Sequence, residues 1–156
     1  MANRMHEQIM DTLATKLAAI STGSGYDITV ATVEQSAKDT VEVPSSLYPW
    51  IGIVYSRTDY EHKATGFLDG TMTINLLSHV SGTTSAILTN KLSDLENSIR
   101  KAIYDDSVLG LEGMIYTRVV SKETNESDPG SLEPGERAGT MLMVIECKYT
   151  VEQVEA

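Results

Sequence analysis

The sequence predicts an α+β fold, a two-layer sandwich in which an antiparallel or mixed sheet of about five strands carries two main helices on one face. Two segments place apolar residues at helical spacing, and several shorter segments have the alternating or wholly apolar patterns of strands. Turns rich in glycine or proline separate them. The 156 residues suit one domain, and a hydrophobic fraction of 41% suffices for a core. We therefore expect residues 1–156 to form a single domain.

The two helices are expected at about 4–20 and 84–104. The first ends before Gly23 and Gly25, which favour a turn, and its apolar positions are Met5, Ile9, Leu13, Leu17 and Ile20. The second repeats apolar residues three or four apart, at Leu88, Leu92, Leu95, Ile99, Ala102 and Ile103. Ser93-Asp94-Leu95-Glu96 fits a capping box, so a start at that point is the alternative.

Strands are expected near 27–35, 50–55, 68–76, 113–121 and 139–150. The segment 50–55 is apolar on both faces, which is typical of a covered central strand. The loop 36–49 precedes it, and residues 57–65 form the charged tip of a hairpin. In the last strand one face should be buried, with Met141, Met143, Ile145, Cys147 and Tyr149 on it. Cys147 is thus expected to be a small buried hydrophobe.

The connector between the last two strands is polar and contains four Pro or Gly residues. It is too long for a tight hairpin, so residues 122–138 are predicted to form an extended loop or hairpin arm. Residues 151–156 are predicted to be a flexible tail.

The charge excludes some functions. The chain has 22 Asp and Glu against 12 Lys and Arg, a net charge of −10, which has the wrong sign for tight binding to phosphate backbones. The single cysteine excludes an intrachain disulfide. No apolar run approaches the ~20 residues that span a bilayer, and the first twenty residues lack the uninterrupted core of a signal peptide. We expect neither membrane insertion nor secretion by that route.

No catalytic constellation is evident, and we expect no catalytic residue, cofactor or metal. His6-Glu7-Gln8-Ile9-Met10 lacks the second histidine of a zinc-protease motif. Asp59, Glu61 and His62 are the one group that could contribute to a metal site, although carboxylates on a charged loop are more often solvated. These observations favour a structural or interaction protein over an enzyme.

The order and spacing of several segments give a resemblance. The helix MHEQIMDTLATKLAAI is followed by GYDITVATV, the Pro-led strand YPWIGIVY, the helical DLENSIRKAIYDD with LGLEGMIYTRVV, and the closing EPGERAGTMLMVIECKYTV. Across roughly residues 5–150 the chain resembles tail terminator proteins of long-tailed bacteriophages, which are also described as minor tail or tail completion proteins.

The resemblance implies a homo-hexameric ring on the head-proximal end of the tail tube. Such a ring stops tube polymerisation and presents the head–tail joining surface, in the neck of a virion assembled in the host cytoplasm. The implied partners are further copies of the chain, the tube protein, a head-side connector protein and, in a contractile tail, the sheath protein. DNA passes through the channel without specific binding, and we expect surplus carboxylates to face it.

Carried to this chain, the resemblance makes two charged segments the candidate interface loops. Their residues are Arg57, Asp59, Glu61, His62, Lys63, Lys122, Glu123, Glu126, Asp128, Glu133, Glu136 and Arg137. One alternative function is a head-side neck adaptor. An alternative of another class is a small cytoplasmic metal-dependent hydrolase or ligand-binding module that uses Asp59, Glu61 and His62.

Overall fold

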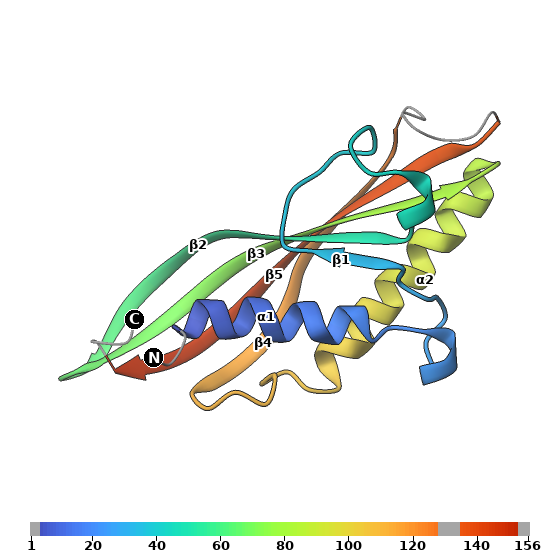
Figure 1. Ribbon diagram of the computed structural model, residues 1–156. Helices are drawn as coiled ribbons and strands as arrows, with labels where there is room; N and C mark the ends of the chain where they lie inside the picture. The colour runs from blue at the N-terminus through green and yellow to red at the C-terminus, as the bar shows by residue number, and fades with distance from the viewer. Residues whose placement is uncertain (1–3, 128–134, 153–156) are drawn as a thin grey trace.

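The computed structural model describes residues 4–127 and 135–152 (Figure 1). It contains a five-stranded sheet and two α-helices, which confirms the predicted α+β class. The helices are α1 (Met5–Ala18) and α2 (Ser85–Tyr104), and the strands are β1 (Thr32–Glu34), β2 (Trp50–Ala64), β3 (Phe67–Gly82), β4 (Met114–Ser127) and β5 (Arg137–Glu152). Short 3₁₀ helices lie at Thr22–Ser24 and Ser45–Leu47.

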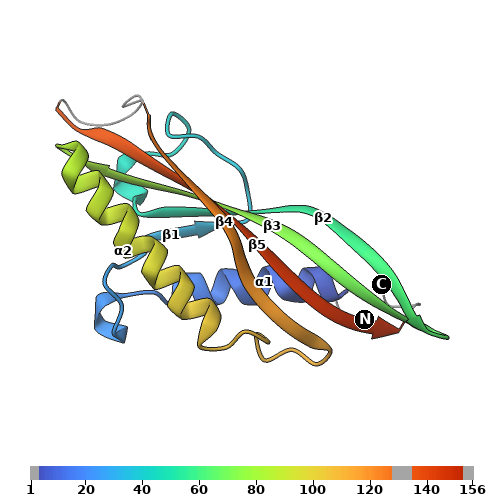
Figure 2. The ribbon, with the colours of Figure 1, turned by 180° about the vertical axis from the view of Figure 1, so that it is seen from behind.

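The sheet is mixed, with the strand order β1-β2-β3-β5-β4. Only β1 and β2 run parallel, and the other neighbours are antiparallel. The strands β2, β3 and β5 are long, and Figures 1 and 2 show them twisting past one another along the length of the molecule. This long twisted sheet carries both α-helices and ends in the two exposed strand pairs described below.

One face of the sheet carries the hydrophobic core. Along β5, buried residues alternate with partly exposed ones, and the predicted buried face is confirmed. The inward side chains of β2, β3 and β5 form one cluster with those of both helices, of which the largest fully buried members include Ile9, Leu13, Leu17, Ile53, Met72, Ile74, Leu76 and Leu88. Cys147 belongs to this cluster, and its burial raises the pKa of the thiol to about 11.

Local sequence explains where α2 begins. Thr84 has an extended backbone, and its hydroxyl oxygen accepts a hydrogen bond from the Ile87 N–H, which satisfies one free donor of the first turn. The alternative start at Ser93-Asp94-Leu95-Glu96 is wrong because these residues lie inside a continuous helix. Ser93 and Asp94 are on its solvent side, while Leu95 is fully buried.

Three predicted boundaries are corrected by the long-range pairing of strands. Residues 57–64 of the predicted hairpin tip are the end of β2, paired with β3, and Thr65 and Gly66 form the turn. Residues 122–127 continue β4, and β5 starts at Arg137, so much of the predicted connector is a two-stranded arm. The strand expected at 27–35 shrinks to the three residues of β1. Charged residues form these strands because the pairing requires only backbone groups.

Within the described residues, the second face of the sheet has no α-helix and is covered only in part. Residues 35–49 cross it beside Trp50, which stacks on the buried His79 ring with centroids 5.1 Å apart. The His79 Nε2–H donates to the Lys38 carbonyl oxygen at 2.7 Å, and Nδ1 lies 3.1 Å from the Thr140 hydroxyl oxygen. Beyond this segment the second face is open, and we call it the open face.

Candidate functional site

The predicted interface residues lie on two exposed arms at opposite ends of the sheet (Figures 1 and 2). The first arm is the end of the β2–β3 hairpin, residues 56–67, where every side chain is exposed except that of Thr58, which is half-buried. The second arm is the end of the β4–β5 pair, described here at residues 121–127 and 137–140. The fold therefore separates the two charged segments that the sequence singled out.

On the first arm, ion pairs join residues along and across the strands. The Arg57 guanidinium Nε lies 3.2 Å from a carboxylate oxygen of Asp59, and Lys63 Nζ lies 3.5 Å from that of the buried Asp69. Asp69 also accepts a hydrogen bond from the Thr150 hydroxyl at 2.6 Å. The Thr150 bond, and then the Lys63 charge, hold the pKa of Asp69 below its usual value. These contacts thus join the outer end of the arm to β5.

The strand geometry argues against the metal site suggested by Asp59, Glu61 and His62. Asp59 stands opposite Thr71 and Glu61 opposite Asp69, so both carboxylates are on the open face. His62 follows Glu61 in the same strand and therefore points to the other face. Among residues 4–127 and 135–152, no group of three His, Cys, Asp or Glu side chains is arranged to hold a metal ion.

Sequence reasoning missed the exposed aromatic residues of the first arm and of the position just before it. Tyr55, Tyr60 and Phe67 are 44%, 48% and 44% exposed, although aromatic side chains are large and mostly apolar. The Tyr55 and Thr58 hydroxyl groups lie within hydrogen-bond distance of each other, at 2.7 Å. Such residues are enriched at protein interfaces. A tyrosine between charged residues, as in Asp59-Tyr60-Glu61, was the available signal.

The second arm carries a different set of charges. Arg137 pairs with Glu126 across the two strands at 2.9 Å, and Lys122 reaches Glu96 of α2 at 2.6 Å. Glu123 is exposed and has no ion pair within the described part of the chain. Glu136 is half-buried just before β5. Asp128 and Glu133, which were also predicted as interface residues, lie outside the described residues.

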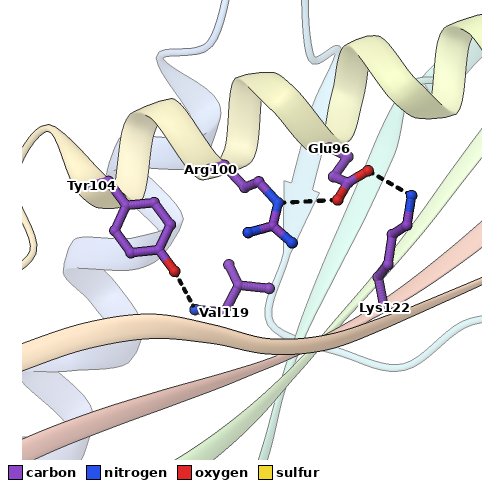
Figure 3. A network of polar contacts seen from close by, with 5 residues as sticks. All are labelled: Glu96, Arg100, Tyr104, Val119 and Lys122. Carbon is purple, nitrogen blue, oxygen red and sulfur yellow. Dashed lines mark hydrogen bonds and ion pairs between the residues drawn. The ribbon is translucent and has the colours of Figure 1, made fainter.

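A polar network fixes α2 against β4 at the base of the second arm (Figure 3). Glu96 accepts hydrogen bonds from Lys122 Nζ at 2.6 Å and from Arg100 Nε at 3.0 Å. The Lys122 bond, followed by the Arg100 bond, holds the pKa of Glu96 below its usual value. One turn beyond Arg100, the Tyr104 hydroxyl oxygen accepts a hydrogen bond from the Val119 N–H at 3.0 Å. The helix therefore occupies part of the exposed edge of β4.

Side chains of the second arm also line a shallow hollow on the open face. Its volume is about 460 Å³, and it is bounded by Glu123, Thr124, Asn125, Thr140 and Leu142. The hollow is wide open to solvent and four of its five lining residues are polar, so it does not have the enclosed apolar shape of a small-molecule site. In the described residues, no helix is long and apolar enough to cross a membrane.

Comparisons with known proteins give a likeness of structure only. No family model matches the chain, and no curated protein matches it. Among solved structures, the chain is similar to one in a structure titled "Virion of native gene transfer agent (GTA) particle". The TM-score is 0.49 and the sequence identity 10%, with 89% of this chain and 92% of that chain covered.

Proposed function

We propose that the protein is a structural component of a virion tail: a ring that caps the head-proximal end of the tail tube, ends tube polymerisation and presents the head–tail joining surface. One observation of the structure supports this proposal most. A single sheet, stiffened by one continuous core, carries two exposed charged arms at opposite ends. The resemblance of residues 5–150 to tail terminator proteins supplies the class.

The two arms suit a subunit that joins unlike partners. A ring built from one repeated heterologous contact closes by rotation and leaves two different faces. One face can then bind the last layer of the tube and the other the head-side connector. Such a ring ends the polymer because its outer face does not repeat the surface of the tube. Arms fixed to a rigid sheet lose little conformational freedom on binding.

The charge of the chain suits a conduit for DNA. With a net charge of −10, a ring of six copies repels phosphate over much of its surface. Carboxylates along the channel therefore leave DNA few sites at which to adhere during passage. This supports a channel through which the genome moves without specific binding.

Tube capping is the direct test. Purified tail tubes of the same virion would be incubated with the protein, mixed with free tube protein, and measured by negative-stain electron microscopy. We expect ring density at one end only and no further elongation at that end, while untreated tubes lengthen. A protein that neither binds tube ends nor changes tube length would refute the proposal. Copurification with heads in place of tails would favour the neck adaptor.

A further inference from the structure

The sheet has two edges, and each has a stretch with no further strand beside it among the described residues. On its outer side β2 is paired with β1 only at Trp50–Gly52, so its residues 53–64 have no strand beside them in the described chain. At the opposite edge, β4 pairs with β5 alone among the described strands. α2 holds the Val119 N–H through Tyr104, and further along β4 the Lys122 side chain reaches Glu96 of α2. Residues 121–126 of β4 are exposed, and free strand edges of this kind are ready to pair with another strand.

We propose that these two edges bind each other in neighbouring copies of the protein. Residues 121–127 of β4 in one copy add antiparallel to the free edge of β2 in the next, with Glu123 opposite Arg57. This inference rests on the proposed ring and names its subunit contact. The direction of pairing follows from the sheet, in which β2, β3, β5 and β4 alternate, so a similarly oriented next copy brings an antiparallel β2.

The directions in which the backbone N–H and C=O groups point at the two edges agree with this pairing. The Val119 N–H points away from β5, because it bonds to Tyr104. In antiparallel pairs the outward and inward backbone groups alternate. Val119 stands opposite Ile145, and Lys122 stands opposite Met143. Since Ile145 and Met143 are two residues apart in β5, the backbone N–H and C=O of Lys122 also point away from β5. The backbone N–H and C=O of the next residue, Glu123, therefore point toward β5.

The same alternation can be followed to the other edge. Ile145 stands opposite Ile74, and Met72, two residues earlier, stands opposite Thr58. The Thr58 backbone groups therefore point outward and those of Arg57 inward. Glu123 and Arg57 would form a non-hydrogen-bonded pair, the kind in which opposite side chains lie closest.

The side chains of this pair share a face and have opposite charges. Glu123 stands opposite Leu142, and Arg57 opposite Thr73, which places both on the open face. Glu123 has no ion pair within the described residues, whereas Arg57 pairs only with Asp59, and those two side chains are 72% and 65% exposed. An ion pair so exposed contributes little, so Arg57 can turn to a new partner at small cost.

A contact between opposite edges of one sheet also has the symmetry that the proposed ring needs. Because the two surfaces differ, the contact is heterologous and repeats from copy to copy until it closes. β1 begins to occupy the edge of β2 at Gly52, so the added strand is confined to the first arm and its base. The second copy is therefore the occupant that the geometry favours for both edges.

Charge reversal tests the pair. Arg57→Glu and Glu123→Arg each place like charges opposite one another, and the double variant restores attraction. By native mass spectrometry we expect each single variant to need about tenfold more protein for half-assembly, corresponding to ~1.4 kcal/mol, and the double variant to assemble nearly as wild type does. Glu112→Arg is the matched control, because Glu112 is exposed and outside both edges. Single variants that assemble like wild type would overturn the inference.

Cross-linking gives a second measurement that does not depend on the charges. Opposite residues in a non-hydrogen-bonded pair are close enough for a disulfide. An equimolar mixture of Arg57→Cys and Glu123→Cys proteins should oxidise to dimers only, while the chain carrying both should give a ladder of linked multimers. The buried Cys147 does not compete. Rings that form without these cross-links would overturn the edge contact alone, whereas a wild-type protein that remains monomeric on tail tubes would overturn the ring itself.

Discussion

Gly52 lies where residues 35–49 cross the open face, and the crossing needs a residue without a side chain. A Cβ atom at this position would overlap the Ser36 carbonyl oxygen and the ring of Trp50. The oxygen belongs to backbone, which yields less easily than the end of a flexible side chain. Gly52 therefore sets how closely this segment approaches the sheet.

Replacing this glycine should destabilise the protein. We expect Gly52→Ala to lower the free energy of unfolding by about 1–3 kcal/mol, the usual cost of overpacking a filled site. Gly23→Ala is the matched control, because a Cβ there meets only the Ser21 hydroxyl oxygen at 3.9 Å. Urea unfolding measures both. An equal effect of the two substitutions would contradict the close packing at Gly52.

His79 makes the stability of the protein depend on pH. Burial lowers its pKa below the ordinary 6.5, although the Lys38 carbonyl bond and the charge of Asp39 act in the opposite direction. The unfolded chain binds a proton near pH 6.5, while the folded chain stays neutral to lower pH. The contribution of His79 is thus fully present above pH 6.5 and is lost as the pH falls through the lowered folded pKa.

This loss can be measured with the single tryptophan, Trp50, because it stacks on His79. Urea unfolding followed by Trp50 fluorescence should show lower stability at pH 5.5 than at pH 7.5. In His79→Gln the difference should shrink, since glutamine does not titrate and the other histidines are shared by both proteins. Carboxylates with lowered pKa, such as Glu96, act only below about pH 4.5. If His79→Gln lost as much stability between pH 7.5 and pH 5.5 as the wild-type protein does, His79 would not be the cause of the loss.

At the scale of elements, α2 joins the core to the second arm. Its buried face includes Leu88, Leu95 and Ile99. At its C-terminal end, the Tyr104 hydroxyl oxygen accepts a hydrogen bond from the backbone of β4. The helix begins at the Thr84 cap, and Arg137 Nη1 of β5 donates to the Ser85 hydroxyl oxygen at 3.1 Å. The cap therefore lies beside the outer end of the second arm, where β5 begins.

Removing the cap should weaken the helix and leave the fold intact. We expect Thr84→Ala to lower the free energy of unfolding by about 1 kcal/mol, because the Ile87 N–H then loses its acceptor, while Thr84→Ser should retain most of the stability. Thr89→Ala serves as control, since the Thr89 hydroxyl bonds only to the Ser85 carbonyl oxygen within the helix. Thermal unfolding distinguishes these variants. Equal losses for Thr84→Ala and Thr84→Ser would refute the capping role.

At the scale of the whole molecule, the 22 acidic and 12 basic residues predict that the assembled protein does not bind DNA tightly. We expect no shift of duplex DNA in gels at physiological salt at micromolar concentrations of protein, because binding to phosphates requires clustered Lys and Arg. The double variant Arg57→Glu with Glu123→Arg keeps the net charge and is the matched control. Tight, salt-dependent DNA binding by the wild-type protein would contradict a passive channel.

The two interface candidates show how far local sequence information reaches. Composition predicts residues 57–65 as the charged tip of a hairpin and residues 122–138 as an extended loop or hairpin arm. No local pattern indicates that Asp59 stands opposite Thr71 or Asn125 opposite Thr140. Pairing between strands distant in sequence decided it. The same pairing separates His62 from Asp59 and Glu61, which composition alone had grouped together.

Periodicity and composition were enough to predict the α+β class, the two helices, the buried face of β5 and the acidic charge, because they are properties of short segments and of the whole chain. The tertiary structure was needed to show that residues 53–64 of β2 and the outer side of β4 have no further strand beside them in the described chain. It was also needed to place Trp50 and His79 under residues 35–49 and the two arms at opposite ends of the sheet. These features depend on strand order and register, and both are set by contacts between residues far apart in the chain.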